Sequence, residues 1–69
     1  MEQNSNQLPE LLSADDLAKL FRISKVSTYR LVEQRRIPFY KIGGSLRFAK
    51  EDVMKFLNDN KFEARGGDK

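Results

Sequence analysis

The side chains of this chain that could do chemistry are carboxylates and cations. The sequence contains no His and no Cys, so neither imidazole nor thiolate is present for metal binding, general-base catalysis or nucleophilic attack. Two adjacent carboxylate pairs, Asp15-Asp16 and Glu51-Asp52, are the remaining candidates for acid–base or metal chemistry. Each pair falls in the first turn of an expected helix, where negative charge offsets the helix dipole. We therefore expect no enzymatic activity, no metal site and no cofactor.

The cations are concentrated in the middle of the chain. Residues 17–50 contain nine Lys and Arg against Glu33 alone, a net charge of +8, whereas residues 1–16 are acidic and residues 51–69 are close to neutral. A basic segment between acidic and neutral ends is typical of a surface that binds a polyanion. The alternative is a solvated face that only aids solubility, and charge alone does not separate the two.

The element that must position these cations is an expected helix over residues 24–34, with Ser24 as its N-cap. At about 100° per residue, Thr28, Leu31 and Val32 share one arc, which is the spacing of a core-facing stripe. We expect the opposite arc to face the major groove of DNA. Its side chains are those of Lys25, Val26, Tyr29, Arg30 and Glu33.

A shorter helix is expected before it, over residues 14–21, begun by a capping box between Ser13 and Asp16. Ile23 would plug the corner between the two helices. Two short helices joined by three or four residues, the second of them basic, are typical of a helix-turn-helix. The same corner also occurs in proteins that bind nothing. The buried stripe of the first helix would consist of Ala14, Leu17, Ala18, Leu20 and Phe21.

A β-hairpin is expected after the second helix, which Pro38 forces to end. Residues 39–42 and 46–48 alternate on either side of Gly43-Gly44-Ser45, which we interpret as the turn. A phosphate-binding loop at the two glycines is disfavoured because P-loop spacing is absent. We expect Tyr40, Ile42 and Phe48 to face the core, and Lys41 and Arg47 to face solvent.

The length allows one small domain. We expect residues 1–10 to form a disordered arm, residues 11–58 the domain and residues 59–69 a flexible tail in which Phe62 packs back or meets a partner. Apolar runs of only two or three residues argue against a membrane span or a signal peptide, so we expect a cytoplasmic protein that does not contact membranes. A third helix over about 50–58 would bury Val53, Phe56 and Leu57.

Two runs of the sequence resemble a known family. Residues 11–31 contain L-L-S-(x)3-L-A-(x)2-F-x-I-S-K-(x)2-T-Y-R-L, and residues 36–53 contain R-I-P-x-Y-K-I-G-G-x-L-R-F-(x)2-E-D-V. This pattern resembles the excisionase family of DNA-binding domains, which are compact relatives of the MerR-type winged helix-turn-helix. The second run is the more specific. The resemblance implies a mainly α fold with a small β-hairpin, a second helix in the major groove, and a hairpin that acts as a wing against the backbone or minor groove.

The sequence departs from that family at Arg22 and Arg35, where Gly is usual. In the left-handed backbone region Arg35 would cost about 1 kcal/mol relative to Gly, and our hypothesis is that it gains a phosphate contact in exchange. Thr28 stands where the family often has a branched apolar residue. Its hydroxyl can bond back to a helix carbonyl, so Thr28 remains compatible with the core.

The outward residues can be given roles on DNA. Arg30 is the candidate for a bidentate pair with guanine, with a phosphate contact as the alternative, and Val26 could meet a thymine methyl group. Lys25, Ser27 and the Tyr29 hydroxyl would hold phosphates. The remaining expected contacts are those of the wing, Lys41, Ser45 and Arg47, and that of Arg36, which would bridge helix and wing.

Three function classes remain open. The first is an excisionase, or recombination directionality factor, of a mobile element, with double-stranded DNA and a site-specific recombinase (integrase) as partners. The second is a small transcriptional regulator with the same binding mode, and the third is a protein-interaction module on this fold. Because one small module binds DNA weakly, we also expect cooperative self-association on adjacent sites.

Overall fold

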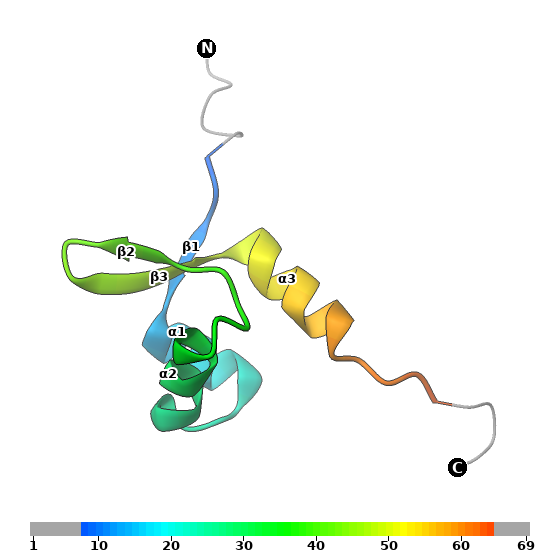
Figure 1. The fold of residues 1–69 in the computed structure, drawn as a ribbon. Coiled ribbons are helices and arrows are strands. Elements are labelled where there is room, and N and C mark those ends of the chain that lie inside the picture. Colours follow the sequence, from blue (N-terminus) through cyan, green and yellow to red (C-terminus); the bar gives the residue numbers. More distant parts are fainter. Residues whose placement is uncertain (1–7, 65–69) are drawn as a thin grey trace.

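The computed structural model describes residues 8–64 of the chain, so the expectations for residues 1–7 and 65–69 lie outside the described part. Three helices and a small antiparallel sheet form a winged helix-turn-helix, as the sequence predicts (Figure 1). The β2–β3 hairpin projects to one side of the helices, and α3 leaves on the other. The elements are β1 (Leu11–Ser13), α1 (Ala14–Phe21), α2 (Lys25–Glu33), β2 (Tyr40–Ile42), β3 (Ser45–Ala49) and α3 (Lys50–Asp59).

Side-chain caps fix where the first two helices begin. The Ser13 hydroxyl accepts from the Asp16 N–H at 3.1 Å, and the Asp16 carboxylate accepts from the Ser13 N–H at 3.1 Å, which confirms the expected capping box. Ser24 caps α2 by accepting from the Ser27 N–H at 3.0 Å. These bonds satisfy backbone donors that lack partners in a first helical turn.

Both helices of the helix-turn-helix end in the same way. Arg22 and Arg35 have φ values of 60° and 57°. The N–H of the residue after each one reaches back to the last full turn, from Ile23 to Ala18 at 3.0 Å and from Arg36 to Leu31 at 2.9 Å. This is the Schellman arrangement, whose left-handed position normally holds Gly. Arg35 therefore has the left-handed conformation on which its hypothetical phosphate contact is conditional.

The sheet contains a strand that the sequence interpretation missed. Its order is β1-β3-β2, with both pairs antiparallel, and Leu12 of β1 lies opposite Phe48 of β3. Leu11–Ser13 is too short to show an alternating pattern, and its partner is far along the chain, so no local signal marks it as a strand. By pairing with β3 immediately before Ala14, β1 attaches the start of α1 to the hairpin.

The expected facing of β2 is wrong, and the turn length explains why. Only Gly43 and Gly44, with φ of 57° and 87°, form the turn, so Ile42 pairs with Ser45 and Lys41 with Leu46. A three-residue turn would have paired Ile42 with Leu46. Because side chains alternate, this one-residue slip exchanges the two faces of β2. The side chains of Tyr40 and Ile42 are 45% and 54% exposed, and Lys41 shares the face of Leu46 and Phe48.

The core lies between the sheet and the three helices. Its fully buried members include Leu17, Ile37, Phe48 and Val53, and Phe21 stacks on Phe56 with ring centroids 5.5 Å apart. Ile37 belongs to this buried cluster and anchors the segment after α2 to the core. Three residues expected in contact with the core are instead exposed by 54%, 37% and 42%: Leu20, Ile23 and Leu57.

Helix geometry accounts for two of these exceptions. In α1 the residues in contact with the core follow the spacing 14, 17, 18, 21, and Leu20 lies about 110° from the centre of that stripe. In α3 the contact stripe is centred between Val53 and Phe56, which leaves Leu57 about 70° away, at the edge of the stripe. Among the described residues no helix is both long enough and apolar enough to cross a membrane.

Candidate nucleic-acid interface

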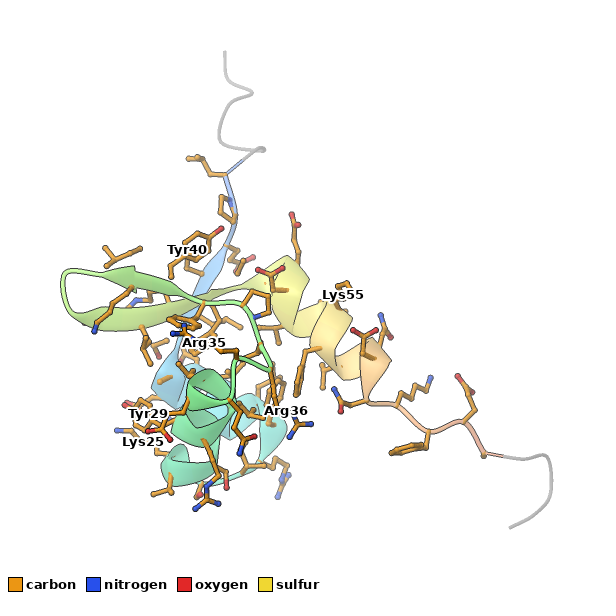
Figure 2. All side chains as sticks on the ribbon, in the orientation of Figure 1. Lys25, Tyr29, Arg35, Arg36, Tyr40 and Lys55 are labelled. Carbon is orange, nitrogen blue, oxygen red and sulfur yellow. The ribbon has the colours of Figure 1, made fainter. Side chains whose placement is uncertain are left out.

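A groove separates the exposed flank of α2 from the hairpin. Its volume is about 810 Å³, and β1, α1, α2, the 35–39 linker and the hairpin all contribute to its walls. Lys25 and Tyr29 lie side by side on α2 below the hairpin, and Arg35 lies at the start of the linker (Figure 2). The groove brings together six of the ten residues expected to contact DNA, namely Lys25, Tyr29, Arg35, Lys41, Ser45 and Arg47.

The charge of the groove is positive but not uniformly so. Four of its lining residues are cationic, and Asp15 and Glu33 are anionic, which leaves a net charge of +2. Lys25 Nζ lies 3.0 Å from the Asp15 carboxylate. The hydrogen bond that Lys25 donates to Asp15, together with the negative charge of that carboxylate, raises the pKa of Lys25 above its usual value. No ion pair joins Glu33 to another of the described residues.

Arg35 is positioned by the end of α2 and by an aromatic ring. Its left-handed backbone turns the chain away from the helix axis, and its guanidinium carbon lies 5.5 Å from the centroid of the Phe39 ring. A cation at this distance over a ring face is attracted by the ring quadrupole. Phe39 therefore holds the guanidinium at the rim of the groove, a role that the sequence interpretation did not assign to it.

The wing contributes residues from both of its strands. Lys41 is exposed on β2, on the face of the sheet that also carries Leu46. Arg47 is half-buried, and its Nη1 donates to the Leu46 carbonyl at 2.7 Å. That bond restrains the Arg47 guanidinium near the strand. Ser45 lies beside the Gly43-Gly44 turn and is exposed.

The outermost face of α2 projects beyond the groove. Val26 is 64% exposed and Tyr29 42%, and Arg30 is exposed as well. Thr28 on the opposite face is fully buried, and its hydroxyl donates to the Ser24 carbonyl at 3.1 Å, as expected. The helix therefore offers Val26 and Arg30 to any surface that it enters.

Two expected contact residues are placed less favourably. Ser27 is half-buried, and its hydroxyl accepts a hydrogen bond from that of Ser24 at 3.1 Å. Arg36 does not lie in the groove. It lines a separate hollow of about 560 Å³ between the linker and α3, together with Asp52 and Lys55 (Figure 2). The structure therefore does not support a bridge from Arg36 to the wing.

Asp15 and Glu33 line the groove although neither is among the ten expected DNA contacts. Glu33 falls on the outward arc of α2, so its position follows from helical periodicity. Asp15 was explained by the helix dipole alone, and its pairing with Lys25 depends on the angle between α1 and α2, which no sequence pattern reports. Among the described residues, no group of His, Cys, Asp or Glu side chains could hold a metal ion.

The arrangement defines a class of protein. Two helices joined by a tight turn, an exposed second helix and a hairpin beside it form the winged helix-turn-helix fold of DNA-binding domains. The family model described as a helix-turn-helix domain matches residues 11–61. The chain belongs to this helix-turn-helix family.

Relatives from Mycobacterium tuberculosis agree with that assignment. The chain is 34% identical over 55 residues to "Putative DNA-binding protein Rv0500A" of strain H37Rv, which covers 80% of this chain and 70% of the relative. The same identity and coverage relate it to "Putative DNA-binding protein MT0521" of strain CDC 1551 / Oshkosh. No solved structure gives a significant match.

Proposed function

We propose that this chain is a sequence-specific double-stranded DNA-binding protein, with α2 in the major groove and the β2–β3 hairpin on the adjacent backbone or minor groove. The observation that carries the proposal is the basic groove between α2 and the wing, next to the exposed face of α2. This arrangement suits duplex DNA, because the major groove of DNA can admit α2 while the DNA phosphates approach the cations of the protein groove.

The residues divide into reading and holding groups. Arg30 and Val26 are available for base edges, because they project beyond the groove. Lys25, Arg35, Lys41 and Arg47 line the groove and suit phosphates. If Arg30 takes its alternative role and also meets a phosphate, roughly five phosphates are neutralised, for which the slope of log K against log salt is about −4 to −5.

Selection of bound sites from random DNA, followed by salt titration of the selected duplex, tests the proposal. We expect one enriched sequence and a steep negative salt slope. In a matched comparison, Arg30→Ala should relax the preference at one or two base positions, whereas Lys41→Gln should weaken binding to all sequences equally. Binding that is absent, or insensitive to salt, would instead favour a protein-interaction module on this fold.

The biological role that we propose is that of an excisionase, a DNA-binding accessory factor for site-specific recombination of a mobile element. The resemblance of the R-I-P-x-Y-K-I-G-G-x-L-R-F run to that family supports this role. A transcriptional regulator would use the same surface. An excision assay with a site-specific recombinase, if one is encoded next to this gene, separates the two, because a regulator would leave the yield of excised product unchanged.

Cooperative binding follows from the size of the domain. A single small module buries only about 600–1,000 Å² on DNA, which gives limited affinity. Phe62 lies beyond α3 and is 95% exposed, so it is available for a neighbouring copy or a recombinase. Because Asn60 caps α3 by donating to the Phe56 carbonyl at 2.8 Å, truncation should begin at Phe62. Removal of residues 62–69 should lower cooperativity on adjacent sites and leave single-site affinity intact.

A further inference from the structure

Asp15 and Asp16 are neighbours in the first turn of α1 but have different partners. Asp16 completes the capping box with Ser13. The Asp15 carboxylate accepts no hydrogen bond from a backbone N–H among the described residues, and it lies 3.0 Å from Lys25 Nζ at the start of α2. The cap of α1 therefore does not require the Asp15 carboxylate, whose one ion pair within residues 8–64 is with Lys25 of the groove.

The Asp15–Lys25 ion pair lies between two hollows that are both lined by cations. Asp15 and Lys25 line the groove beside the wing, and both also line a second hollow at the helix-turn-helix corner with Lys19 and Arg22. The two side chains are 61% and 55% exposed, and exposed pairs of this kind contribute little to stability. A carboxylate at the junction of two basic surfaces repels phosphate and occupies the ammonium group that would attract it.

We infer that Asp15 limits the affinity of this protein for DNA: it retains the Lys25 ammonium in an internal ion pair and so weakens non-specific attraction to the phosphate backbone. The inference rests on the proposed function. A phosphate gains the Lys25 contact only by displacing the carboxylate, so the contact is favourable where the backbone is held at the correct position and costly elsewhere. Discrimination of this kind uses an unfavourable interaction with wrong partners.

The test is salt titration of Asp15→Asn on a duplex of random sequence. If Lys25 becomes free to neutralise one more phosphate, the slope of log K against log salt should steepen by about 0.9. The ratio of the variant's affinity to that of the wild type should then grow roughly three- to fourfold as salt falls from about 200 to 50 mM. Binding to the selected site should tighten less, so the ratio of specific to non-specific affinity should fall. Asp15→Ser, which also suits a first helical turn, should reproduce the result if Asp15→Asn folds poorly.

A mutant cycle separates release of Lys25 from a general loss of negative charge. In a Lys25→Gln background, Asp15→Asn should have less than half of its effect on the slope. Asp59→Asn provides the matched control, because it removes a carboxylate that pairs with Lys55 at 3.1 Å on α3, away from the groove. It should leave the slope unchanged.

Each contrary outcome identifies what has failed. An unchanged slope for Asp15→Asn, in a wild-type protein that binds DNA with clear salt dependence, overturns the inference and leaves the proposed function standing. Equal effects in both backgrounds, or an equal effect of Asp59→Asn, overturn the assignment to Lys25. Absence of salt-dependent binding by the wild type overturns the proposed function, and the inference with it.

Discussion

The guanidinium carbon of Arg35 lies 5.5 Å from the centroid of the Phe39 ring, and the backbone of Arg35 is left-handed, with a φ of 57°. A left-handed conformation costs a non-glycine residue about 1–2 kcal/mol, and an exposed cation–π contact returns about 0.5–1 kcal/mol. The contact therefore offsets part of the backbone strain and places a cation at the rim of the groove. Arg22 has the same backbone conformation but no aromatic partner among the described residues.

This difference predicts unequal responses to the same substitution. Arg22→Gly should stabilise the domain by about 1 kcal/mol, a rise of about 4–8 °C in Tm for a domain of this size. Arg35→Gly should give less than half of that gain, because relief of strain is accompanied by loss of the Phe39 contact. Thermal unfolding followed by circular dichroism measures both. Equal gains would mean that the cation–π contact contributes nothing.

The same pair of variants tests the phosphate contact of Arg35. Arg35→Gly should weaken DNA binding and make the salt slope shallower by about 0.9, the value for one phosphate. Arg22→Gly, which lies outside the groove, should change the slope less. Unchanged affinity in Arg35→Gly would show that Arg35 makes no DNA contact, and the left-handed conformation of Arg35 would then have no functional explanation.

The features that the sequence predicts correctly are those with local causes. Ser13, Ser24 and the 3.6-residue periodicity of α2 each act within a few residues, and each was placed correctly. Two of the missed features depend instead on distant parts of the chain. β1 is a strand only because β3 lies beside it, and the Asp15–Lys25 pair requires the angle between two helices.

The error in β2 is of a different kind, because it arose from one residue of turn length. The interpretation that placed Ser45 in the turn predicted the wrong face for every side chain in β2, although it predicted the hairpin correctly. Six of the ten expected DNA contacts nevertheless line one groove. The prediction of these contacts rests on charge and on the outward arc of α2 as well as on the facing of β2, so the error in β2 affects only part of it.

Asp16 predicts a dependence of stability on pH. The hydrogen bond from the Ser13 backbone N–H, followed by that from its hydroxyl, lowers the pKa of Asp16 below 3.8. The folded state therefore binds this proton less readily than the unfolded state, so its contribution to stability is present above about pH 4 and is lost as pH falls through the folded-state pKa. Asp16→Asn should flatten the unfolding free energy between about pH 5 and pH 2.

Ser13→Ala is the matched variant for that experiment. It removes the hydroxyl but retains the backbone N–H, which is the larger cause of the pKa shift. It should lower stability by about 1 kcal/mol at neutral pH and keep most of the pH dependence. Urea unfolding at a series of pH values measures both quantities, and a pH dependence that disappears in Ser13→Ala would assign the effect to the hydroxyl instead.

Thr28 predicts tolerance of an apolar replacement at a buried polar position. Thr28 is fully buried, and its hydroxyl shares the Ser24 carbonyl with the Thr28 N–H, which also donates at 3.1 Å. In Thr28→Val that carbonyl keeps one donor, so the change should stay within about 1 kcal/mol. Thr28→Ala removes volume from the core and should be the more destabilising of the two. The opposite order in urea unfolding would show that the hydroxyl bond outweighs packing.

The wing supplies a prediction that depends directly on its register. Lys41 faces the groove, whereas Tyr40 and Ile42 lie on the other face of β2 and do not line it. Lys41→Gln should therefore weaken DNA binding and reduce the salt slope by about 0.9, and Ile42→Thr should leave both unchanged. Neither change should alter stability by more than about 0.5 kcal/mol, because both side chains are exposed. If Ile42→Thr weakened binding while Lys41→Gln did not, β2 would meet DNA with its other face, as a three-residue turn would require.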